Sequence, residues 1–593
     1  MTKILGISAF YHDSAAALLV DEKIVAAAQE ERFTRKKNDS SFPRSAINYI
    51  LEEAKISFNE IDYVVFYEKP LLKFKRLLKT YIANAPKGYN SFENAMNTWI
   101  GKKIFQKKNI LKAINEWTND FNTKKLLFAE HHESHAASAF YPSPFKEAII
   151  LTLDGVGESA TSTVAIGKNN KIDIIKEIHF PHSIGLLYSA FTFYLGFKVN
   201  NGEYKVMGLA PYGKPIYKDL ILNNLIDVKE DGSFFLNQLF FNYTGGFNMI
   251  NQKFIDLFKK PKRNSETENI TQFHMDIASS IQYVLEEIIL KITKKLSCDY
   301  KLPNLCMAGG VALNCVANSK ILKSGYFKNL WIQPASGDAG GALGAALLVW
   351  YKKLNNSRTL LSSDSMRGSY LGPKYSETEI EKILLESKAK FKIMDNREII
   401  ETTAKAISEN KTIGWFQGRM EFGPRALGNR SILANPLSDK MQKILNLKIK
   451  YRESFRPFAP SIIKENLAQW FEFDKDSPYM LFVAKVQKKI CINMTDKEKD
   501  LFGIDKLNIK RSIIPAVTHV DYSSRIQTVH EQTNPKYHSL IKEFERITGC
   551  PILVNTSFNI QEEPIVCNPK NAFKCFMNND LDILVIENYY LEK

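Results

Sequence analysis

The chain has 593 residues, 45% of them apolar, and a formal net charge of +16. At roughly 100–200 residues per domain, this length predicts two to four domains with substantial cores. The amino-terminal stretch lacks the charged start and long apolar centre of a signal peptide, and the longest apolar run, residues 341–351, is too short to span a bilayer. We therefore expect a cytoplasmic protein with no membrane partner.

The distribution of cysteine and lysine residues argues against disulfide-linked, cysteine-zinc and nucleic-acid-binding proteins. The seven cysteines occur singly, with no C-x-x-C pair, which disfavours a disulfide framework and a cysteine zinc site. The positive charge raises nucleic acid as a partner. However, the densest basic stretch, residues 69–117, is interleaved with apolar residues at helical spacing, which favours the solvated face of amphipathic helices. A nucleic-acid partner is therefore not our first expectation.

The first elements in the chain form a hairpin pattern that occurs twice. Residues 4–10 and 15–21 predict two short strands joined by the polar turn YHDS, and residues 24–31 predict a third. Residues 147–178 repeat the pattern of buried strand, acidic Gly turn, strand and tight turn. Two hairpin-led lobes of this kind are the plan of the actin-like ATPase fold, so the sequence predicts an α/β domain with an internal duplication.

Three histidines lie between the two copies, in the stretch LLFAEHHESHAASAF. If this stretch is helical, His131 and His135 share one face and are within reach of one metal ion. Alternatively, these imidazoles only make hydrogen bonds in a polar crevice. The spacing alone does not decide between the two.

Two strand-to-helix turns follow. NLCMAGGVALNCVANSKIL predicts a Gly-Gly turn that directs backbone N–H groups and a helix N-terminus at a ligand, which suits an anion. Alternatively, the glycines only permit tight packing. WIQPASGDAGGALGAALLVWY places Asp338 at the start of a second helix of small residues.

A change of composition marks the domain boundary. We predict a first domain over residues 1–355, a linker rich in Ser, Arg and Gly over 356–372, and a second domain over 373–593. The second domain places its cations among Gly, Pro and aromatic residues, which favours an oxyanion pocket for ATP or an acyl phosphate. These cations are Arg419, Arg425, Arg430, Lys450, Arg452, Arg456 and, further on, Arg525. The strand tip of PILVNTSFN adds Asn555, Thr556 and Ser557 as donors.

Taken together, these motifs resemble the NodU/CmcH/TobZ-type O-carbamoyltransferases. The matching segments cover nearly the whole chain in order: GISAFYHDSAAALLVD, HHESHAASAF, LDGVGE, GEYKVMGLAPYG, GGVALNCVANSKI, SGDAGGALGAA, GRMEFGPRALGNRSILANP, FRPFAPS, THVDYSSRIQTV and NTSFN. The resemblance implies a TsaD-like domain of the duplicated actin-like, or ribonuclease-H-like, fold, followed by an α+β YrdC-like domain. It also implies that carbamoyl phosphate and ATP form carbamoyl-adenylate, from which the carbamoyl group passes to an acceptor hydroxyl.

The resemblance assigns roles to residues already singled out. It implies metal binding by His131, His135, Asp154 and Asp338. Two imidazoles with carboxylates suit Fe(II), our first choice, or Zn or Mn better than Ca or Mg, although Mg can accompany ATP. Residues Gly309, Gly310, Asn314 and Asn318 would hold the adenylate. The cations Arg425, Lys450, Arg456 and Arg525 would hold carbamoyl phosphate and ATP, while Arg419 and Arg430 either join them or brace the backbone.

The acceptor is expected to be a small hydroxylated molecule, and its hydroxyl needs a base. His12 and Asp13, in the first hairpin turn, are the candidates, although His12 alternatively only closes that turn. Lys205 is a candidate contact to phosphate or acceptor. A tRNA-modifying threonylcarbamoyl-type transferase and an actin-fold kinase or ATPase remain alternatives, and a homodimer is compatible with the sequence.

Overall fold

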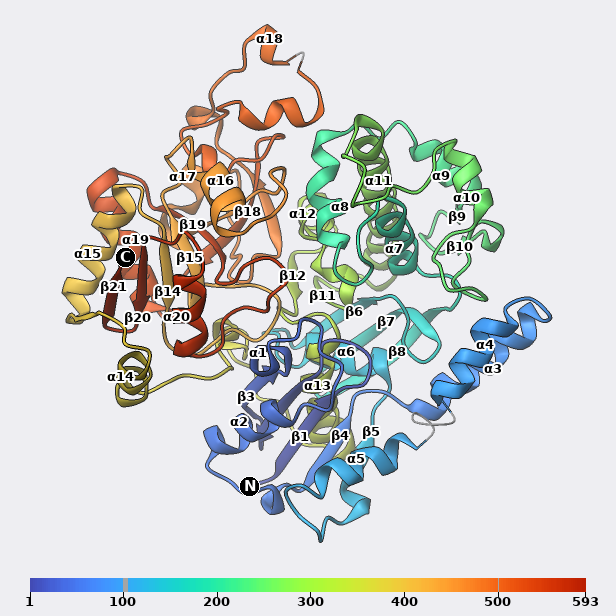
Figure 1. Cartoon of the computed structure of the whole chain (residues 1–593). Helices are drawn as coiled ribbons and strands as arrows, with labels where there is room; N and C mark the ends of the chain where they lie inside the picture. The colour runs from blue at the N-terminus through green and yellow to red at the C-terminus, as the bar shows by residue number, and fades with distance from the viewer. Residues whose placement is uncertain (100–104, 500) are drawn as a thin grey trace. The chain divides into compact units, whose positions relative to one another are not determined.

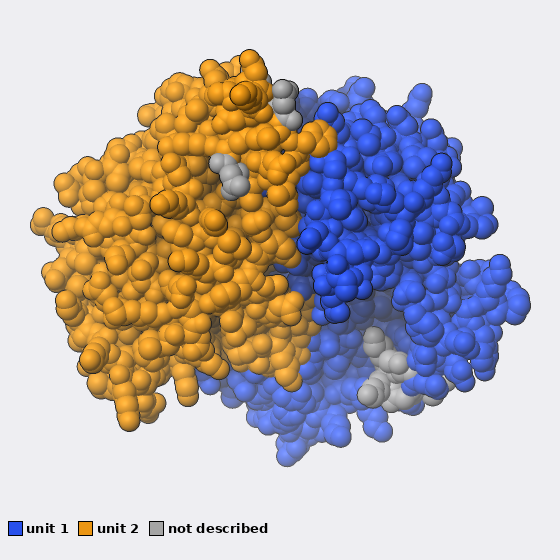
Figure 2. Space-filling model, turned by 45° about the horizontal axis from the view of Figure 1, so that its top comes forward, with its two compact units in different colours: residues 1–30, 40–365 blue, residues 31–39, 366–593 orange. Residues whose placement is uncertain are grey.

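The computed structural model describes residues 1–99, 105–499 and 501–593 (Figure 1). The chain divides into two compact units (Figure 2). Unit 1 comprises residues 1–30 and 40–365, and unit 2 comprises residues 31–39 and 366–593. The later division falls inside the span 356–372 that the sequence predicts as a linker. Among the described residues, no helix combines the length and apolar character needed to cross a bilayer.

The first sheet of unit 1 has the strand order β3-β2-β1-β4-β5. β1 pairs antiparallel with β2 and parallel with β4, β2 pairs antiparallel with β3, and β5 is parallel to β4. Nearly every residue of β1 and β2 is buried, because helices cover the sheet. The strands are β1 (Lys3–Ser8), β2 (Ala15–Val20), β3 (Lys23–Gln29), β4 (Tyr63–Phe66) and β5 (Leu126–Phe128).

The second sheet repeats this topology. Its order is β12-β11-β6-β7-β8, with an antiparallel meander from β6 to β8 and two parallel strands on the other side of β6. The strands are β6 (Glu147–Leu153), β7 (Ala160–Lys168), β8 (Lys171–His179), β11 (Asn304–Ala308) and β12 (Asn329–Ile332). The duplicated actin-like plan predicted from the two hairpin patterns is thus confirmed.

Helices α6 (His131–Phe140) and α13 (Asp338–Leu348) lie between the two sheets (Figure 1). Every residue of α13 is buried, and its small side chains allow close packing. A Cβ added to Gly344 would lie 1.8 Å from the carbonyl oxygen of Ser134 on α6, so only glycine fits there. This contact places the start of α13 beside the histidines of α6.

The remaining elements of unit 1 cover the sheets or extend from them. They are α2 (Arg44–Ala54), α3 (Pro70–Asn84), α4 (Tyr89–Thr98), α5 (Gln106–Ile114), α7 (Ile184–Tyr194), α8 (Glu203–Leu209), α9 (Lys218–Asn224), β9 (Ile226–Val228), β10 (Phe234–Leu236), α10 (Gln252–Phe258), α11 (Gln272–Tyr300) and α12 (Cys315–Ser324).

Unit 2 is built on a mixed nine-stranded sheet of order β13-β21-β20-β14-β15-β19-β16-β18-β17. The strands are β13 (Lys392–Ile393), β14 (Ile413–Phe416), β15 (Arg430–Ala434), β16 (Ala459–Ile463), β17 (Phe482–Lys485), β18 (Ser523–Val529), β19 (Ile552–Ser557), β20 (Ile583–Ile586) and β21 (Tyr589–Glu592). The helices are α1 (Glu31–Thr34), α14 (Glu377–Glu386), α15 (Asn396–Ser408), α16 (Met441–Ile444), α17 (Leu467–Trp470), α18 (Asp496–Lys499), α19 (Pro535–Thr548) and α20 (Pro569–Met577).

Residues 31–39 follow β3 of the first sheet in the chain but belong to unit 2. Arg32 donates to the carbonyl of Gly423 at 2.8 Å, and Arg35 donates to the carbonyl of Ile565 at 2.6 Å. Two buried or half-buried guanidinium groups therefore tie this short segment to loops far along the chain. No local feature of the sequence indicates that residues 31–39 belong to unit 2.

Candidate active site

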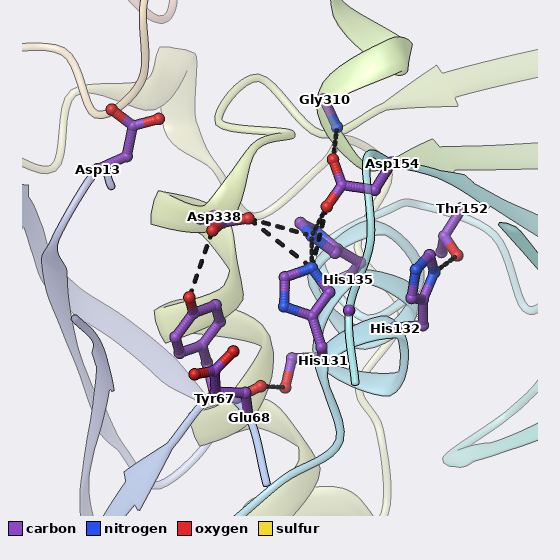
Figure 3. A network of polar contacts seen from close by, with 12 residues as sticks. Asp13, Tyr67, Glu68, His131, His132, His135, Thr152, Asp154, Gly310 and Asp338 are labelled. Atoms are coloured by element: carbon purple, nitrogen blue, oxygen red, sulfur yellow. Dashed lines mark hydrogen bonds and ion pairs between the residues drawn. The ribbon is translucent and has the colours of Figure 1, made fainter. Parts of the chain in front are cut away.

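Four side chains converge in unit 1 as a candidate metal centre (Figure 3). The Nε2 atoms of His131 and His135 are 3.1 Å apart, as expected for two imidazoles on one helix face. Asp154 Oδ2 lies 3.0 Å from His131 Nε2 and 3.7 Å from His135 Nε2. Asp338 Oδ1 lies 3.8 Å and 3.7 Å from the same two nitrogens. One ligand atom from each residue thus lies within 4.8 Å of all the others.

Hydrogen bonds to the backbone fix two of these ligands, His131 and Asp154. The carboxylate of Glu158 accepts the backbone N–H of His131 at 3.0 Å and so satisfies a donor at the first turn of α6. Asp154 directly follows β6, and its Oδ1 accepts the backbone N–H of Gly310 at 3.1 Å. The sequence did not identify Glu158 as a supporting residue.

The third histidine of the stretch turns away from this cluster (Figure 3). His132 Nδ1 lies 2.6 Å from Thr152 Oγ1, which in turn lies 2.6 Å from Thr163 Oγ1. Burial, together with the nearby imidazoles of His131 and His135, lowers the pKa of His132 to about 3. His132 is therefore a neutral, hydrogen-bonded core residue, and the metal-site alternative applies only to the other two histidines.

The chemistry of the donor set fits a divalent transition metal. Among the described residues, the Nδ1 atoms of His131 and His135 are buried without a hydrogen-bond partner, whereas both Nε2 atoms face the two carboxylates. Two imidazoles and two carboxylates in a buried cluster are typical ligands of Fe, Zn or Mn. The four residues that the family resemblance implies as metal ligands are therefore brought together by the fold.

The imidazoles and carboxylates of the cluster shift one another's pKa values. Burial alone would raise the pKa of Asp154, but hydrogen bonds from His131 and His135 outweigh it and hold that pKa well below its usual range. Conversely, burial alone would lower the pKa of His135, but Asp154 and Asp338 raise it to about 9. Without a metal ion, His135 therefore carries a proton at neutral pH.

This proton predicts the pH dependence of metal binding. A metal ion must displace the proton from His135 below about pH 9, so affinity should fall by about tenfold for each pH unit between pH 8 and pH 6. Raising the pH should correspondingly strengthen binding. Competition with a chelator of known affinity at several pH values measures this slope, and an affinity that does not change with pH would contradict the assignment.

The predicted base lies at the edge of the cluster. His12 Nε2 is 3.8 Å from Asp338 Oδ2, and its Nδ1 is 3.1 Å from Asp13 Oδ2. Burial opposes protonation of His12, but Asp338 and Asp13 raise its pKa to about 9. Tyr67, which follows β4, donates its hydroxyl to Asp338 Oδ2 at 3.3 Å and was not identified from the sequence. Lys205 lies on α8, with its Nζ 5.6 Å from the centroid of the Phe197 ring.

The Gly-Gly turn after β11 also reaches the cluster. Gly309 has φ +90°, and a Cβ there would lie 2.2 Å from the carbonyl oxygen of Leu153, so the turn requires glycine. Asn314 caps α12 by accepting the N–H of Ala317 at 3.0 Å. Asn318 donates to the carbonyl of Ala312 at 2.8 Å. Both asparagine side chains therefore stabilise the turn, whereas the N–H of Gly310 points at Asp154.

In unit 2, Lys450 is a buried cation held by oxygen atoms. Its Nζ lies 2.6 Å from the carbonyl oxygen of Ser557, 3.2 Å from Ser557 Oγ, and 2.8 and 2.7 Å from Asn559 O and Oδ1. Burial and the positive charges of Arg452 and Arg456 lower its pKa, whereas the four oxygen atoms favour the ammonium form. Lys450 thus fixes the strand tip that the sequence predicts as a ligand-binding element.

The other residues predicted for the oxyanion pocket of unit 2 include Asn555, Thr556 and Ser557 at the tip of strand β19. Asn555 on β19 is buried and donates to Ser461 Oγ at 3.0 Å and Gln527 Oε1 at 2.9 Å, so its amide joins β19 to β16 and β18. The half-buried residues of the predicted set are Arg419, Arg425, Arg452, Arg456, Arg525, Thr556 and Ser557. The guanidinium of Arg456 lies 3.8 Å from Glu453.

Arg419 and Arg430 both donate hydrogen bonds to backbone carbonyl groups. Arg419 donates to the carbonyls of Gly372 at 3.0 Å and Leu371 at 2.6 Å. Arg430 is fully buried and lies over the ring of Phe416, 3.5 Å from its centroid. Its guanidinium donates to the carbonyls of Gln417 (2.6 Å), Asn429 (2.9 Å), Pro373 (3.0 Å) and Gly418 (3.1 Å). These contacts favour the bracing alternative, through carbonyl groups rather than carboxylates.

A stability prediction follows for Arg430. Arg430→Met should lower the free energy of unfolding by about 3–5 kcal/mol, because three buried carbonyl groups and the less buried carbonyl of Gly418 lose their donor. The thermal unfolding midpoint of the full chain measures this. Arg397→Met, at an exposed position on α15, is the matched control and should leave the midpoint unchanged. Equal midpoints for the two variants would contradict the bracing role.

The fold and the site together define an enzyme of the duplicated actin-like class with a candidate metal centre. Family comparison then gives the particular family: residues 3–347 match the model described as carbamoyltransferase N-terminus, and residues 404–593 match carbamoyltransferase C-terminus. The chain belongs to the carbamoyltransferase family and is a carbamoyltransferase.

Similar proteins cover most or all of the chain. Over its whole length it is 56% identical to protein sll1178 of Synechocystis sp., covering 97% of that protein. It is 33% identical to nodulation protein NolNO of Sinorhizobium fredii, over 99% of this chain and 80% of that protein. It is also 35% identical to nodulation protein NolO of Bradyrhizobium diazoefficiens, over 78% of each chain. These relatives are consistent with the family assignment.

Proposed function

We propose that this carbamoyltransferase forms carbamoyl-adenylate from carbamoyl phosphate and ATP, and then transfers the carbamoyl group to the hydroxyl of a small-molecule acceptor. The first half-reaction consumes one water to convert carbamoyl phosphate into carbamate and phosphate. The carbamate oxygen then attacks the α-phosphate of ATP and displaces pyrophosphate, and both steps are assigned to unit 2. The second releases AMP and is assigned to unit 1. The observation that carries the proposal is the cluster of His131, His135, Asp154 and Asp338 inside the segment that matches the carbamoyltransferase N-terminus.

The residues of unit 1 have distinct tasks in the proposed transfer. His131, His135, Asp154 and Asp338 would hold a metal ion, for which Fe(II), Zn or Mn fit the ligand set. Such an ion would supply Lewis-acid stabilisation of negative charge on the leaving AMP. Gly310 and Tyr67 orient Asp154 and Asp338 through their hydrogen bonds. His12, held by Asp13, is assigned to accept the proton of the acceptor hydroxyl, for which it must be in its neutral form. A cation at the four ligands would favour that neutral form, because it would offset the charge of Asp338.

In unit 2, the proposed donor site combines the cations around the β19 tip. Lys450 holds Ser557 and Asn559, and its own charge lies near those of Arg452 and Arg456. Guanidinium groups bind phosphate oxygens in a bidentate manner, so Arg425, Arg456 and Arg525 are assigned to carbamoyl phosphate and ATP. Mg can accompany ATP at this site.

The acceptor class can be tested by following labelled carbamoyl phosphate. The enzyme, ATP and [14C]carbamoyl phosphate should label members of a panel of hydroxylated small molecules, and omission of ATP should abolish the label. A parallel reaction with tRNA tests the alternative of a tRNA-modifying transferase, which the net charge of +16 favours. Label in tRNA and none in the small molecules would overturn the proposed acceptor class.

A further inference from the structure

Two helices between β4 and β5 extend from unit 1 as a hairpin, α3 and α4, which we call the α3–α4 hairpin (Figure 1). Tyr81 of α3 stacks on Phe92 of α4, with ring centroids 3.8 Å apart, and this contact holds the two helices together. The buried side chains of α3 are those of Pro70 and Lys73. Most of this 15-residue helix is therefore outside the core.

The inner side of α3 is held by polar contacts. Lys73 Nζ lies 2.8 Å from Glu68 Oε2, and Arg76 Nη1 donates to the carbonyl of Gly157 at 2.6 Å. These two cations therefore have their partners inside unit 1. The other two cations of α3, Lys75 and Lys79, are exposed.

The outer side of α3 carries apolar side chains beside these lysines. Leu71 is 68% exposed, Leu72 42% and Ile82 73%. At 100° per residue, Leu71 and Ile82 lie about 20° apart around the helix, with Lys75 and Lys79 within about 80° of Leu71. One exposed stripe thus combines three large aliphatic side chains with two lysines. The sequence predicted a solvated basic face, which does not account for the aliphatic residues.

The charge of the hairpin is predominantly positive. Residues 70–98 contain five Lys or Arg and one Glu, a difference of +4 within a chain of net charge +16. The stretch Pro70–Asn84 contains no acidic residue. Such a stripe has the composition of a helix that lies in the plane of a membrane interface, with leucines in the acyl boundary and lysines at the headgroups.

We propose that the α3–α4 hairpin is a peripheral docking surface for an anionic lipid bilayer. The lysines provide attraction to acidic headgroups, and Leu71, Leu72 and Ile82 enter the boundary of the acyl region. Nucleic acid is less suitable as an occupant, because phosphate contacts use the lysines but leave these aliphatic side chains in water. The proposal does not depend on the reaction assigned to the enzyme.

Cosedimentation of the full-length protein with vesicles tests this surface. The probes are vesicles of phosphatidylglycerol and phosphatidylcholine at 3:7, and of phosphatidylcholine alone. Wild-type protein should bind the anionic vesicles at least tenfold more tightly, because each lysine near an acidic surface contributes about a fivefold gain. Equal binding to both vesicles, or no binding to either, would overturn the proposal.

Two variants separate the contribution of the lysine charges to vesicle binding from the contribution of the aliphatic side chains. Lys75→Glu/Lys79→Glu should remove the preference for anionic lipid, and Leu71→Ser/Leu72→Ser/Ile82→Ser should weaken binding at least tenfold to anionic vesicles. The matched control, Lys382→Glu/Leu385→Ser, changes an exposed lysine and an exposed leucine on α14 of unit 2 and should bind as wild type. Circular dichroism checks that each variant is folded.

Two outcomes would reject the assignment. If both hairpin variants bind vesicles as wild type does, another surface is responsible. If a labelled single-stranded oligonucleotide binds wild type but not Lys75→Glu/Lys79→Glu, and vesicles do not bind at all, then the hairpin is a nucleic-acid surface instead.

Discussion

Replacing His131 or Asp338 by Ala is expected to remove the bound metal and to lower carbamoyl transfer by at least about a thousandfold. Lewis-acid stabilisation of a leaving phosphate is worth several kcal/mol, and about 4 kcal/mol corresponds to a thousandfold change in rate. Each residue supplies one of four ligand atoms that lie within 4.8 Å of one another. Metal content by elemental analysis and transfer of [14C]carbamoyl to an acceptor are the two measurements.

The same variants should keep the first half-reaction. Pyrophosphate release from ATP and carbamoyl phosphate is assigned to unit 2, and none of the metal ligands belongs to that unit. His131→Ala and Asp338→Ala should therefore retain the rate of pyrophosphate release within about threefold. His179→Ala, an exposed histidine on β8, is the matched control and should keep both metal and transfer. Loss of pyrophosphate release in the ligand variants would contradict the division of labour between the units.

The second large effect is expected at Lys450. Lys450→Met keeps the length of the side chain but removes the charge and the bonds that hold Ser557 and Asn559. Losing a buried cation that holds a ligand-binding strand tip in position is expected to cost about 3–4 kcal/mol of transition-state stabilisation, so pyrophosphate release should fall by about 100- to 1,000-fold. A coupled pyrophosphate assay measures this rate.

The control for Lys450 lies two residues earlier. Lys448→Met removes an exposed lysine of the same segment and should leave pyrophosphate release unchanged. Metal content should be normal in both variants, because the metal ligands are all in unit 1. Unchanged release in Lys450→Met would remove Lys450 from the donor site and leave it with a structural role alone.

Sequence patterns were sufficient for the duplicated sheet, whereas the four residues of the candidate metal cluster were grouped through the family resemblance. Strand, tight turn and strand are local signals, so the repeat of β1 to β3 in β6 to β8 is visible without any structure. His131 and His135 share a helix face by spacing alone, while the acidic turns at Asp154 and Asp338 were joined to them through the family resemblance. The fold brings all four together.

The sequence did not predict several contacts between residues that are far apart in the chain. Tyr67 reaches Asp338 only because β4 and α13 pack together, and no feature of the YVVFYE stretch indicates that contact. Arg430 sits in a cationic motif, yet burial and four carbonyl acceptors give it a bracing role. Residues 31–39 belong to unit 2 although they follow a strand of unit 1. Each of these depends on neighbours far away in the chain, which spacing and composition do not encode.

The most direct measurement of the central claim is the fate of ATP when the purified protein turns over carbamoyl phosphate with an acceptor. The account predicts AMP and pyrophosphate in a one-to-one ratio with the carbamoylated product, and carbamoyl-adenylate in the acceptor-free reaction of His131→Ala. Formation of ADP, or carbamoyl transfer that proceeds without ATP, would contradict it.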